Sequence, residues 1–169
     1  GGLATRLGQT AATLPKYLLP VGGRPFAEWQ LAKLAACGFD RVVLLVGHLG
    51  DMIADTLGDG SRLGVRLTFC SDGDALLGTA GALVAAVDAL DPTFLVTYGD
   101  SYLPFDYGLP VRDLAAHLQA AGTMTVYRNA DRFDRSNSLV VGDWVQAYDK
   151  DAAAGDFEHI DYGAIALRR

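Results

Sequence analysis

The sequence predicts an α/β fold with a mainly parallel sheet and helices on both of its faces. Short apolar runs rich in Val and Leu alternate with segments of helical periodicity, which is typical of buried strands joined by helices. The 20 glycines among 169 residues fall mostly at the turns between these runs. With 50% hydrophobic and 20% charged residues, the composition is that of an ordinary globular chain.

The elements follow one another in alternation. The expected strands are Arg41–Val46, Val65–Phe69, Phe94–Thr97 and Thr123–Tyr127, and the expected helices are Phe26–Ala36, Gly50–Leu57, Thr79–Leu90 and Val111–Ala121. Pro25 suits the first turn of its helix, Gly38 suits the stop after Cys37, and Thr79 is a candidate N-cap. In open sheets of this kind ligands bind outside the carboxyl ends of the strands, so the loops after strands should carry the chemistry.

After Asp134 the pattern changes to short strands separated by polar turns. These are Ser138–Val141, Val145–Asp149 and Tyr162–Leu167, and they predict a small antiparallel extension beside the main sheet. We therefore expect a single domain over residues 1–169, with a core over 1–130 and the extension over 131–169. The chain opens in a loop without a preceding strand and stops inside an expected strand, so we expect both ends to be truncated.

Charge and cysteine content exclude several classes. The net charge of -6 and the lack of a basic tract argue against binding to nucleic acid, although not against binding one nucleotide. Cys37 and Cys70 have no CxxC spacing and are expected to be buried thiols. No run approaches the roughly 18 apolar residues of a membrane span, and no signal peptide is visible, so we expect a cytoplasmic protein without membrane contact.

The first chemical segment is GGLATRLGQTAATLPK, residues 1–16. Small residues at positions 1, 2 and 4 let backbone N–H groups approach an anion, and Arg6 and Lys16 can bring two cations to it. A Gly-rich turn with two surface cations is the simpler explanation of the glycines alone, since the segment is neither a Walker loop nor GxGxxG. The segment becomes a phosphate site only if Arg6 and Lys16 converge.

Two further segments follow expected strands. In ALLGTAGAL, residues 75–83, two glycines flank a helix start, so backbone could lie against a flat ligand such as a base. Taken alone, a tight strand-to-helix connection explains it better. In YGDSY, residues 98–102, Asp100 leaves the carboxyl end of a strand. Mg²⁺ takes one or two carboxylates together with phosphate oxygens and water, so Asp100 is a candidate partial site. An Asp in a Gly turn is the alternative.

Together the three segments resemble the sugar-1-phosphate nucleotidyltransferases, the NDP-sugar pyrophosphorylases. That family has a GGxGTRL signature followed by a P-K pair, and this sequence has GGLATRL and then Pro15-Lys16. The LGTAGA element and the GD motif of the family match residues 77–82 and 99–100. Ala4 replaces the usual glycine, a tuning change because alanine permits most loop conformations. The resemblance implies a Rossmann-like fold of the nucleotide-diphospho-sugar transferase type.

The resemblance implies a role for each matching residue on the nucleotide side. The nucleotide would be bound by Gly1, Gly2, Leu3, Ala4 and Thr5 around the triphosphate and by Asp72, Gly73, Gly78 and Thr79 along the base and ribose. Three residues would be catalytic. Arg6 would hold the phosphates, Lys16 would neutralise charge where the sugar phosphate attacks, and Asp100 would bind Mg²⁺, the expected cofactor.

On the sugar-phosphate side the implied residues are Gly99, Asn137, Asp149, Lys150 and Asp161. The stretch Tyr148–Lys150 is similar to the family's E-K-P element, with a shorter acid, and Asp151 stands in place of the proline. The family's second metal-binding aspartate has no candidate before Arg169.

The implied reaction is attack of a sugar 1-phosphate on the α-phosphorus of a nucleoside triphosphate, which releases pyrophosphate without a covalent enzyme intermediate. The SNSLVV, YDK and HIDYG segments look most like heptose- or mannose-1-phosphate guanylyltransferases, which favours GTP. Two alternatives stay open: a cytidylyltransferase for a non-sugar phosphate such as phosphocholine, and a non-catalytic regulatory homologue that binds nucleotide sugars. A homo-oligomer is compatible with either.

Overall fold

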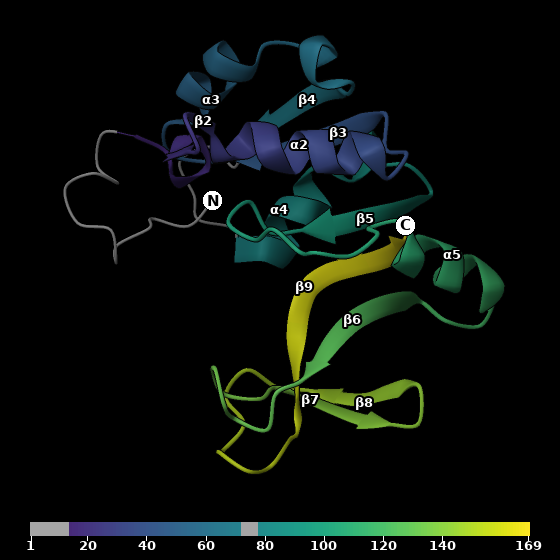
Figure 1. Cartoon of the computed structure of the whole chain (residues 1–169). Helices are drawn as coiled ribbons and strands as arrows, with labels where there is room; N and C mark the ends of the chain where they lie inside the picture. The colour runs from purple at the N-terminus through teal and green to yellow at the C-terminus, as the bar shows by residue number, and fades with distance from the viewer. Residues whose placement is uncertain (1–13, 72–77) are drawn as a thin grey trace. The chain divides into compact units, whose positions relative to one another are not determined.

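The computed structural model describes residues 14–71 and 78–169, which belong to two compact units (Figure 1). One unit contains the chain up to Pro92 together with Arg169, and the other contains Thr93–Arg168. This division falls elsewhere than the expected boundary between core and extension after residue 130, which stays a prediction.

The first unit opens with a short turn and a hairpin that lead into a helix. These are η2 (Lys16–Leu18), β1 (Pro20–Val21), β2 (Arg24–Pro25) and α2 (Phe26–Ala36). Trp29 Nε1 donates to the carbonyl of Val21 at 2.8 Å, and the Arg24 guanidinium lies 3.4 Å from the centre of the Trp29 ring, so α2 is tied to the hairpin. Pro25 precedes the first helical residue and does not occupy the first turn. Gly38, with φ of 92°, follows the end of α2 as predicted.

Two parallel strands form the sheet of this unit. β3 (Arg41–Val46) and β4 (Arg66–Ser71) pair with Arg41 opposite Arg66 and Val46 opposite Ser71, so their carboxyl ends meet at one edge. The connection contains α3 (Gly50–Leu57) and η3 (Ser61–Leu63). An ion pair of 2.6 Å between Glu28 and Arg62 joins α2 to η3. This strand–helix–strand unit is the parallel arrangement that the sequence predicts.

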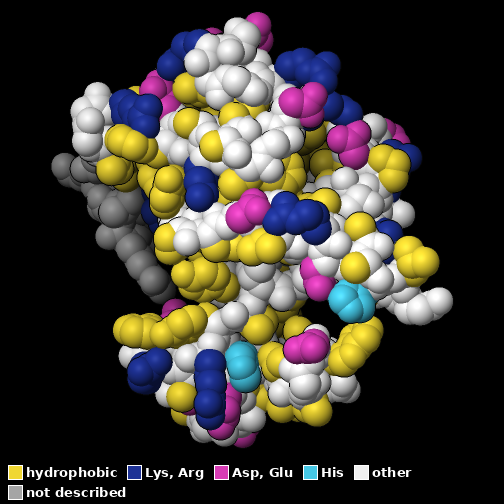
Figure 2. Space-filling model, turned by 45° about the vertical axis from the view of Figure 1, so that its right-hand side comes forward, with side chains coloured by type: hydrophobic (Ala, Val, Ile, Leu, Met, Phe, Trp, Pro, Cys, Tyr) yellow, Lys and Arg dark blue, Asp and Glu magenta, His cyan; other side chains and the backbone are white. Residues whose placement is uncertain are grey.

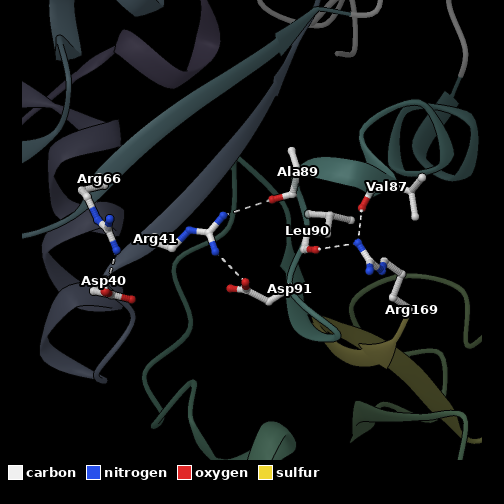
Figure 3. A network of polar contacts seen from close by, with 8 residues as sticks. All are labelled: Asp40, Arg41, Arg66, Val87, Ala89, Leu90, Asp91 and Arg169. Carbon is white, nitrogen blue, oxygen red and sulfur yellow. Dashed lines mark hydrogen bonds and ion pairs between the residues drawn. The ribbon is translucent and has the colours of Figure 1, made fainter.

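The helix expected over Thr79–Leu90 is shorter, and Thr79 is not its N-cap. α4 (Gly78–Ala85) begins one residue earlier, at a glycine with φ of 68°, so Thr79 lies inside the helix. The chain continues as η4 (Val87–Ala89). Arg169 donates to the carbonyls of Val87 and Leu90, and Arg41 reaches the carbonyl of Ala89 (Figure 3). Arginines thus satisfy carbonyls that a continuing α-helix would otherwise bond.

The second unit is built on a five-stranded sheet with one helix. Its elements are β5 (Thr93–Thr97), α5 (Leu109–Ala116), β6 (Gly122–Arg128), β7 (Ser138–Val141), β8 (Trp144–Tyr148) and β9 (His159–Arg168). β9, the curved yellow strand of Figure 1, pairs antiparallel with both β5 and β6. The hairpin of β7 and β8 joins β9 where Ser138 lies opposite His159. The helix expected over Val111–Ala121 starts and ends earlier, and near its end Arg168 donates to the carbonyls of Leu114 and His117.

The placement of the last strand in the extension is therefore wrong. β9 contains the expected strand Tyr162–Leu167, but it pairs with both β5 and β6, the two strands expected to belong to the main sheet. The described pairings are consequently mixed, with β3 and β4 as the parallel pair among them.

A register shift bends β9 where it passes β6. Met124 lies opposite Ile165 and Val126 opposite Asp161, so residues 162–164 all face Thr125. Gly163 has φ of 97°, a conformation that glycine adopts without a steric penalty. The Thr125 hydroxyl donates to the carbonyl of Ala164 at 2.8 Å, and the Thr97 hydroxyl donates to that of Gly163 at 2.9 Å. These side chains hold the bulge in place.

Each unit has its own apolar core. In the first, α2 buries Ala27, Leu31 and Leu34 at helical spacing and α3 buries Ile53 and Leu57. In the second, the largest fully buried side chains include Tyr107 and Leu114, and Ala164 and Ala166 of β9 are also fully buried.

Both cysteines are free and partly exposed, which corrects the expectation of buried thiols: Cys37 sits at the end of a helix, and neither is among the core residues. Within the described ranges, no helix is long and apolar enough to cross a membrane. Figure 2 shows Lys and Arg side chains interspersed with Asp and Glu on the face that it displays.

Candidate functional site

The predicted site residues fall into three groups. Gly1, Gly2, Leu3, Ala4, Thr5, Arg6, Asp72 and Gly73 lie outside the described residues. Lys16, Gly78 and Thr79 belong to the first unit, and Gly99, Asp100, Asn137, Asp149, Lys150 and Asp161 belong to the second.

Lys16 stands on an exposed turn between two buried residues. It opens η2, where the N–H of Leu18 donates to the carbonyl of Pro15 at 2.8 Å. Pro15 and Leu18 are buried, whereas Lys16 is exposed. The N–H of Phe26 donates to the carbonyl of Leu19 at 2.9 Å, which fastens the segment to α2. The local fold thus presents the ammonium group of Lys16 away from the core.

A cavity of about 440 Å³ opens at the carboxyl ends of β3 and β4. It is lined by Val46 and Ser71 at the strand ends and by Gly47, Leu49, Gly50, Asp51 and Met52 from the turn into α3. Gly50 permits this turn, because a Cβ there would lie 2.8 Å from Cγ2 of Val46. Leu49 takes a left-handed conformation with φ of 62°. Open parallel sheets generally bind ligands at this edge, and the cavity lies there.

Asp100 lies on an exposed turn at the carboxyl end of β5. The N–H of Ser101 donates to the carbonyl of Tyr98 at 3.2 Å and closes the turn. The Ser101 hydroxyl lies 3.4 Å from Oδ1 of Asp100. The carboxylate is thus presented at the strand end where the GD motif places it. Among the described residues there is no cluster of three His, Cys, Asp or Glu side chains that could hold a metal ion.

Asn137 joins three chain segments that are distant in sequence. Its N–H donates to the carbonyl of His159 at 2.8 Å, and its carbonyl accepts the N–H of Asp149 at 2.9 Å. Its side-chain Oδ1 accepts the N–H of Asp161 and the hydroxyl of Ser138, each at 2.9 Å. The structure therefore brings together Asn137, Asp149 and Asp161, which the sequence singles out from separate segments.

Asp161 is held on both of its carboxylate oxygens. Oδ1 accepts the N–H of Gly163 at 2.8 Å, and Oδ2 accepts the hydroxyl of Tyr98 at 3.0 Å. Burial raises the pKa of Tyr98 strongly, and the negative charge of Asp161 raises that pKa further, so the phenol remains a donor at neutral pH. Each carboxylate oxygen has a second lone pair that this arrangement does not use.

Asp149 and Lys150 follow β8 at the exposed end of the same cluster. Oδ1 of Asp149 accepts the N–H of Asp151 at 2.9 Å, which closes a turn in which Asp151 stands where the related motif has proline. Both Asp149 and Lys150 are exposed to solvent. The carboxylate of Asp149 and the ammonium group of Lys150 thus belong to adjacent residues, and a backbone hydrogen bond joins Asp149 to Asn137.

A model of the MobA-like NTP transferase domain matches residues 1–156 of this chain. The chain belongs to this family. Over 107 residues this NTP transferase domain is 36% identical to N-acetylmuramate alpha-1-phosphate uridylyltransferase of Neisseria meningitidis serogroup B, which covers 63% of the chain and 46% of that protein. It is 33% identical over 101 residues to mannose-1-phosphate guanylyltransferase of Mycobacterium tuberculosis, which covers 59% and 28%. The matching stretch spans less than half the length of either relative.

Solved structures share the fold of this NTP transferase domain. HddC from Yersinia pseudotuberculosis complexed with GMP-PN superposes with a TM-score of 0.75 at 24% identity, over 99% of this chain and 73% of that one. The inositol-1-phosphate CTP transferase from T. maritima gives a TM-score of 0.79 at 20% identity, over 99% and 67%. The Rossmann-like α/β fold class and the resemblance to sugar-1-phosphate nucleotidyltransferases are thereby confirmed.

Sequence reasoning missed one residue of this NTP transferase domain. The sequence pattern assigns no role to Tyr98, although its hydroxyl contacts Asp161. A tyrosine at a strand end, directly before Gly-Asp, indicates by its position alone that it lies beside the candidate metal-binding turn. Its partner lies 63 residues away, and no spacing rule pairs two residues at that distance.

Proposed function

We propose that this protein transfers a nucleoside monophosphate from a nucleoside triphosphate to a sugar 1-phosphate, giving an NDP-sugar and pyrophosphate. The observation that carries the proposal is the set of hydrogen bonds around Asn137, which joins it to Asp149 and Asp161. All three come from segments that resemble sugar-1-phosphate nucleotidyltransferases, and the chain's relatives include a uridylyltransferase and a guanylyltransferase for sugar 1-phosphates.

The nucleotide belongs to the first unit in this proposal. The backbone of Gly1–Thr5 and the side chain of Arg6 hold the triphosphate, while Asp72, Gly73, Gly78 and Thr79 border the base and ribose. The cavity at the carboxyl ends of β3 and β4 supports this assignment, since it lies where parallel sheets bind nucleotides. Exposed Lys16 offsets the negative charge that builds up as the sugar phosphate attacks.

The sugar phosphate belongs to the second unit. Asp149 and Asp161 accept hydrogen bonds from sugar hydroxyls, the Asn137 amide group donates one, and Gly99 leaves room for the ligand beside the turn. The lone pairs that remain on Asp161 and the Asn137 amide group suit this task, because a sugar hydroxyl both donates and accepts. Lys150 neutralises the phosphate of the sugar.

Asp100 is the residue that would hold Mg²⁺. Its exposed carboxylate supplies the hard oxygen that Mg²⁺ prefers, at a strand end where substrate phosphates would complete the shell. The bound ion would screen the charge of the triphosphate and of the departing pyrophosphate. The position of Asp100 on the turn after β5 would fix where the ion binds.

GTP is the nucleotide that we favour, because the SNSLVV, YDK and HIDYG segments look most like guanylyltransferases. HddC, which shares the fold, is complexed with GMP-PN in one of its structures. We place the protein in the cytoplasm, where its two free thiols would stay reduced.

The test is a matrix of substrates. The full-length protein is incubated with Mg²⁺, each of the common nucleoside triphosphates and a panel of sugar 1-phosphates, and products are identified by mass spectrometry. We expect one NDP-sugar, with GTP as the donor. A parallel reaction with CTP and phosphocholine examines the non-sugar alternative, and product there alone would replace the proposal. If no pair yields product, the proposed function is wrong.

A further inference from the structure

One hydrogen bond links the turn that carries Asp100 to the residues around Asn137. Tyr98 follows the last residue of β5, and its hydroxyl donates to Oδ2 of Asp161 on β9 at 3.0 Å. The N–H of Asp161 in turn donates to Oδ1 of Asn137 at 2.9 Å. Asp100 comes two residues after Tyr98. We propose that Tyr98 is a positioning residue that fixes the Asp100 turn relative to the sugar-phosphate residues, an inference that rests on the proposed function.

The ring of Tyr98 is held along its edge as well as at its hydroxyl. It lies against Gly163, where an added Cβ would be 3.4 Å from Cδ2 and 3.8 Å from Cε2 of the ring. Gly163 is buried, has φ of 97°, and sits in the bulge of β9. Because Ala164, the next residue, pairs with Thr97 in the sheet of β5 and β9, the ring rests on a backbone segment that is itself held.

The same bulge holds Asp161 from the other side. Gly163 donates its N–H to Oδ1 of Asp161 at 2.8 Å, so the carboxylate is fixed at both oxygens when Tyr98 donates to Oδ2. A carboxylate fixed in this way presents its remaining lone pairs in set directions. Removing the Tyr98 hydroxyl would free the Asp161 carboxylate to rotate and would remove one of the contacts that tie the start of the Asp100 turn to β9.

Loss of the Tyr98 hydroxyl should affect the catalytic rate more than the affinity for the nucleoside triphosphate. The groups that hold the two substrates must keep the reacting atoms in line, and a misplacement of about 1 Å can cost about 100-fold in rate. Tyr98 does not need to touch a substrate to act in this way. Its effect should therefore fall on kcat, while binding of the nucleoside triphosphate by the first unit stays the same.

The test compares Tyr98→Phe with Thr97→Val in the full-length protein. Both variants remove one partly buried hydroxyl that bonds to the β9 bulge, and each bond is about 3 Å long. Only Tyr98→Phe breaks the link to Asp161. We expect Tyr98→Phe to lower kcat about 10- to 100-fold with the KM for the triphosphate within about twofold. Thr97→Val should keep kcat within about twofold, although both should lower the thermal midpoint by similar amounts.

A double-mutant cycle identifies the route of the effect. If Tyr98 acts through Asp161, the combination of Tyr98→Phe with Asp161→Asn loses no more kcat than the more damaging single variant. Multiplicative losses would overturn the inference. Electron paramagnetic resonance of Mn²⁺ bound together with nucleotide adds a readout without turnover, and Tyr98→Phe should change the shape of the Mn²⁺ signal whereas Thr97→Val should not.

The outcomes separate the two proposals. Product formation by the wild-type protein, with Tyr98→Phe indistinguishable from Thr97→Val, overturns the role of Tyr98 and leaves the proposed function intact. Absence of product from the wild-type protein overturns the proposed function and this inference with it.

Discussion

Asn137 and Asp161 are joined by a hydrogen bond of 2.9 Å from the N–H of Asp161 to the side-chain Oδ1 of Asn137. This bond fastens the residue before β7 to β9, and it uses only one end of the Asn137 amide group. Of the described residues, none accepts a hydrogen bond from the other end, Nδ2. The amide thus combines a structural acceptor with a donor that can serve a substrate.

Asn137→Asp separates these two functions. Aspartate keeps the oxygen that accepts the Asp161 N–H, but it loses the donor and adds a negative charge beside Asp149 and Asp161. We expect the KM for the sugar phosphate to rise about 10-fold or more, while the unfolding free energy changes by less than about 1 kcal/mol. Steady-state kinetics and urea unfolding measure the two effects. An unchanged KM with lowered stability would show that Asn137 is purely structural.

Acid should loosen the loop that precedes Asn137, because Asp131 accepts the N–H groups of Ser136 and Gly155 at 2.7 and 2.8 Å. The bonds from Ser136 and Gly155 hold the pKa of Asp131 below its ordinary value of 3.8. A carboxyl group with a depressed pKa in the folded state stabilises the protein above its unfolded-state pKa, and that contribution is lost as pH falls through the folded value. Stability linked to Asp131 should therefore decline below about pH 4.

Asp131→Asn tests this dependence. Asparagine tolerates the left-handed backbone of residue 131, where φ is 55°, and still offers an oxygen to one N–H group. The thermal midpoint of the variant should fall less steeply between about pH 5 and pH 2.5 than that of the wild-type protein. Asp156→Asn, in an exposed turn of the same unit, serves as the control and should follow the wild-type slope more closely. Parallel slopes for all three proteins would contradict the assignment.

Local elements were predictable because their signals are local. α2, α3 and β3 have the bounds that apolar periodicity and the glycine after Cys37 indicate. The position of β9 was not predictable, because Thr93 pairs with Arg168 and Gly122 with Leu167 across long stretches of chain. A strand whose apolar residues are mainly Ile, Ala and Leu has the same sequence pattern at the centre of a sheet as in an extension beside it.

The candidate site was predictable as a set of residues but not as an arrangement. Motif likeness singled out Asn137, Asp149 and Asp161, and the backbone bonds of Asn137 bring them together. The partnership of Tyr98 with Asp161 depends on the bulge at Gly163, which follows from how β9 meets two neighbouring strands. Tertiary pairing of that kind has no signature in one sequence.

Substitution of two glycines in the loop after α3 distinguishes the cost of backbone strain from the cost of overpacking. Gly58 and Gly60 have φ of 59° and 80°, but only at Gly60 would a Cβ meet other atoms, with Cγ of Leu67 at 2.6 Å and the carbonyl of Val65 at 2.9 Å. Gly58→Ala should cost about 1–3 kcal/mol of unfolding free energy from its backbone alone, because φ of 59° with ψ of -141° is a conformation that only glycine adopts readily. Gly60→Ala should cost about 1–3 kcal/mol more because of overpacking. Urea unfolding of both variants measures the difference, and equal losses would mean that the Leu67 side chain moves aside freely.

Lys16→Ala examines the charge that the proposed reaction needs on the first unit. Lys16 is exposed on η2, so its removal should change the unfolding free energy by less than about 0.5 kcal/mol. If its ammonium group stabilises the charge of the transition state, kcat/KM for pyrophosphate release should fall about 100- to 1,000-fold. Lys33→Ala, in the last turn of α2, removes the same charge from the same unit and should leave the rate nearly unchanged. Equal rates for the two variants would remove Lys16 from the reaction.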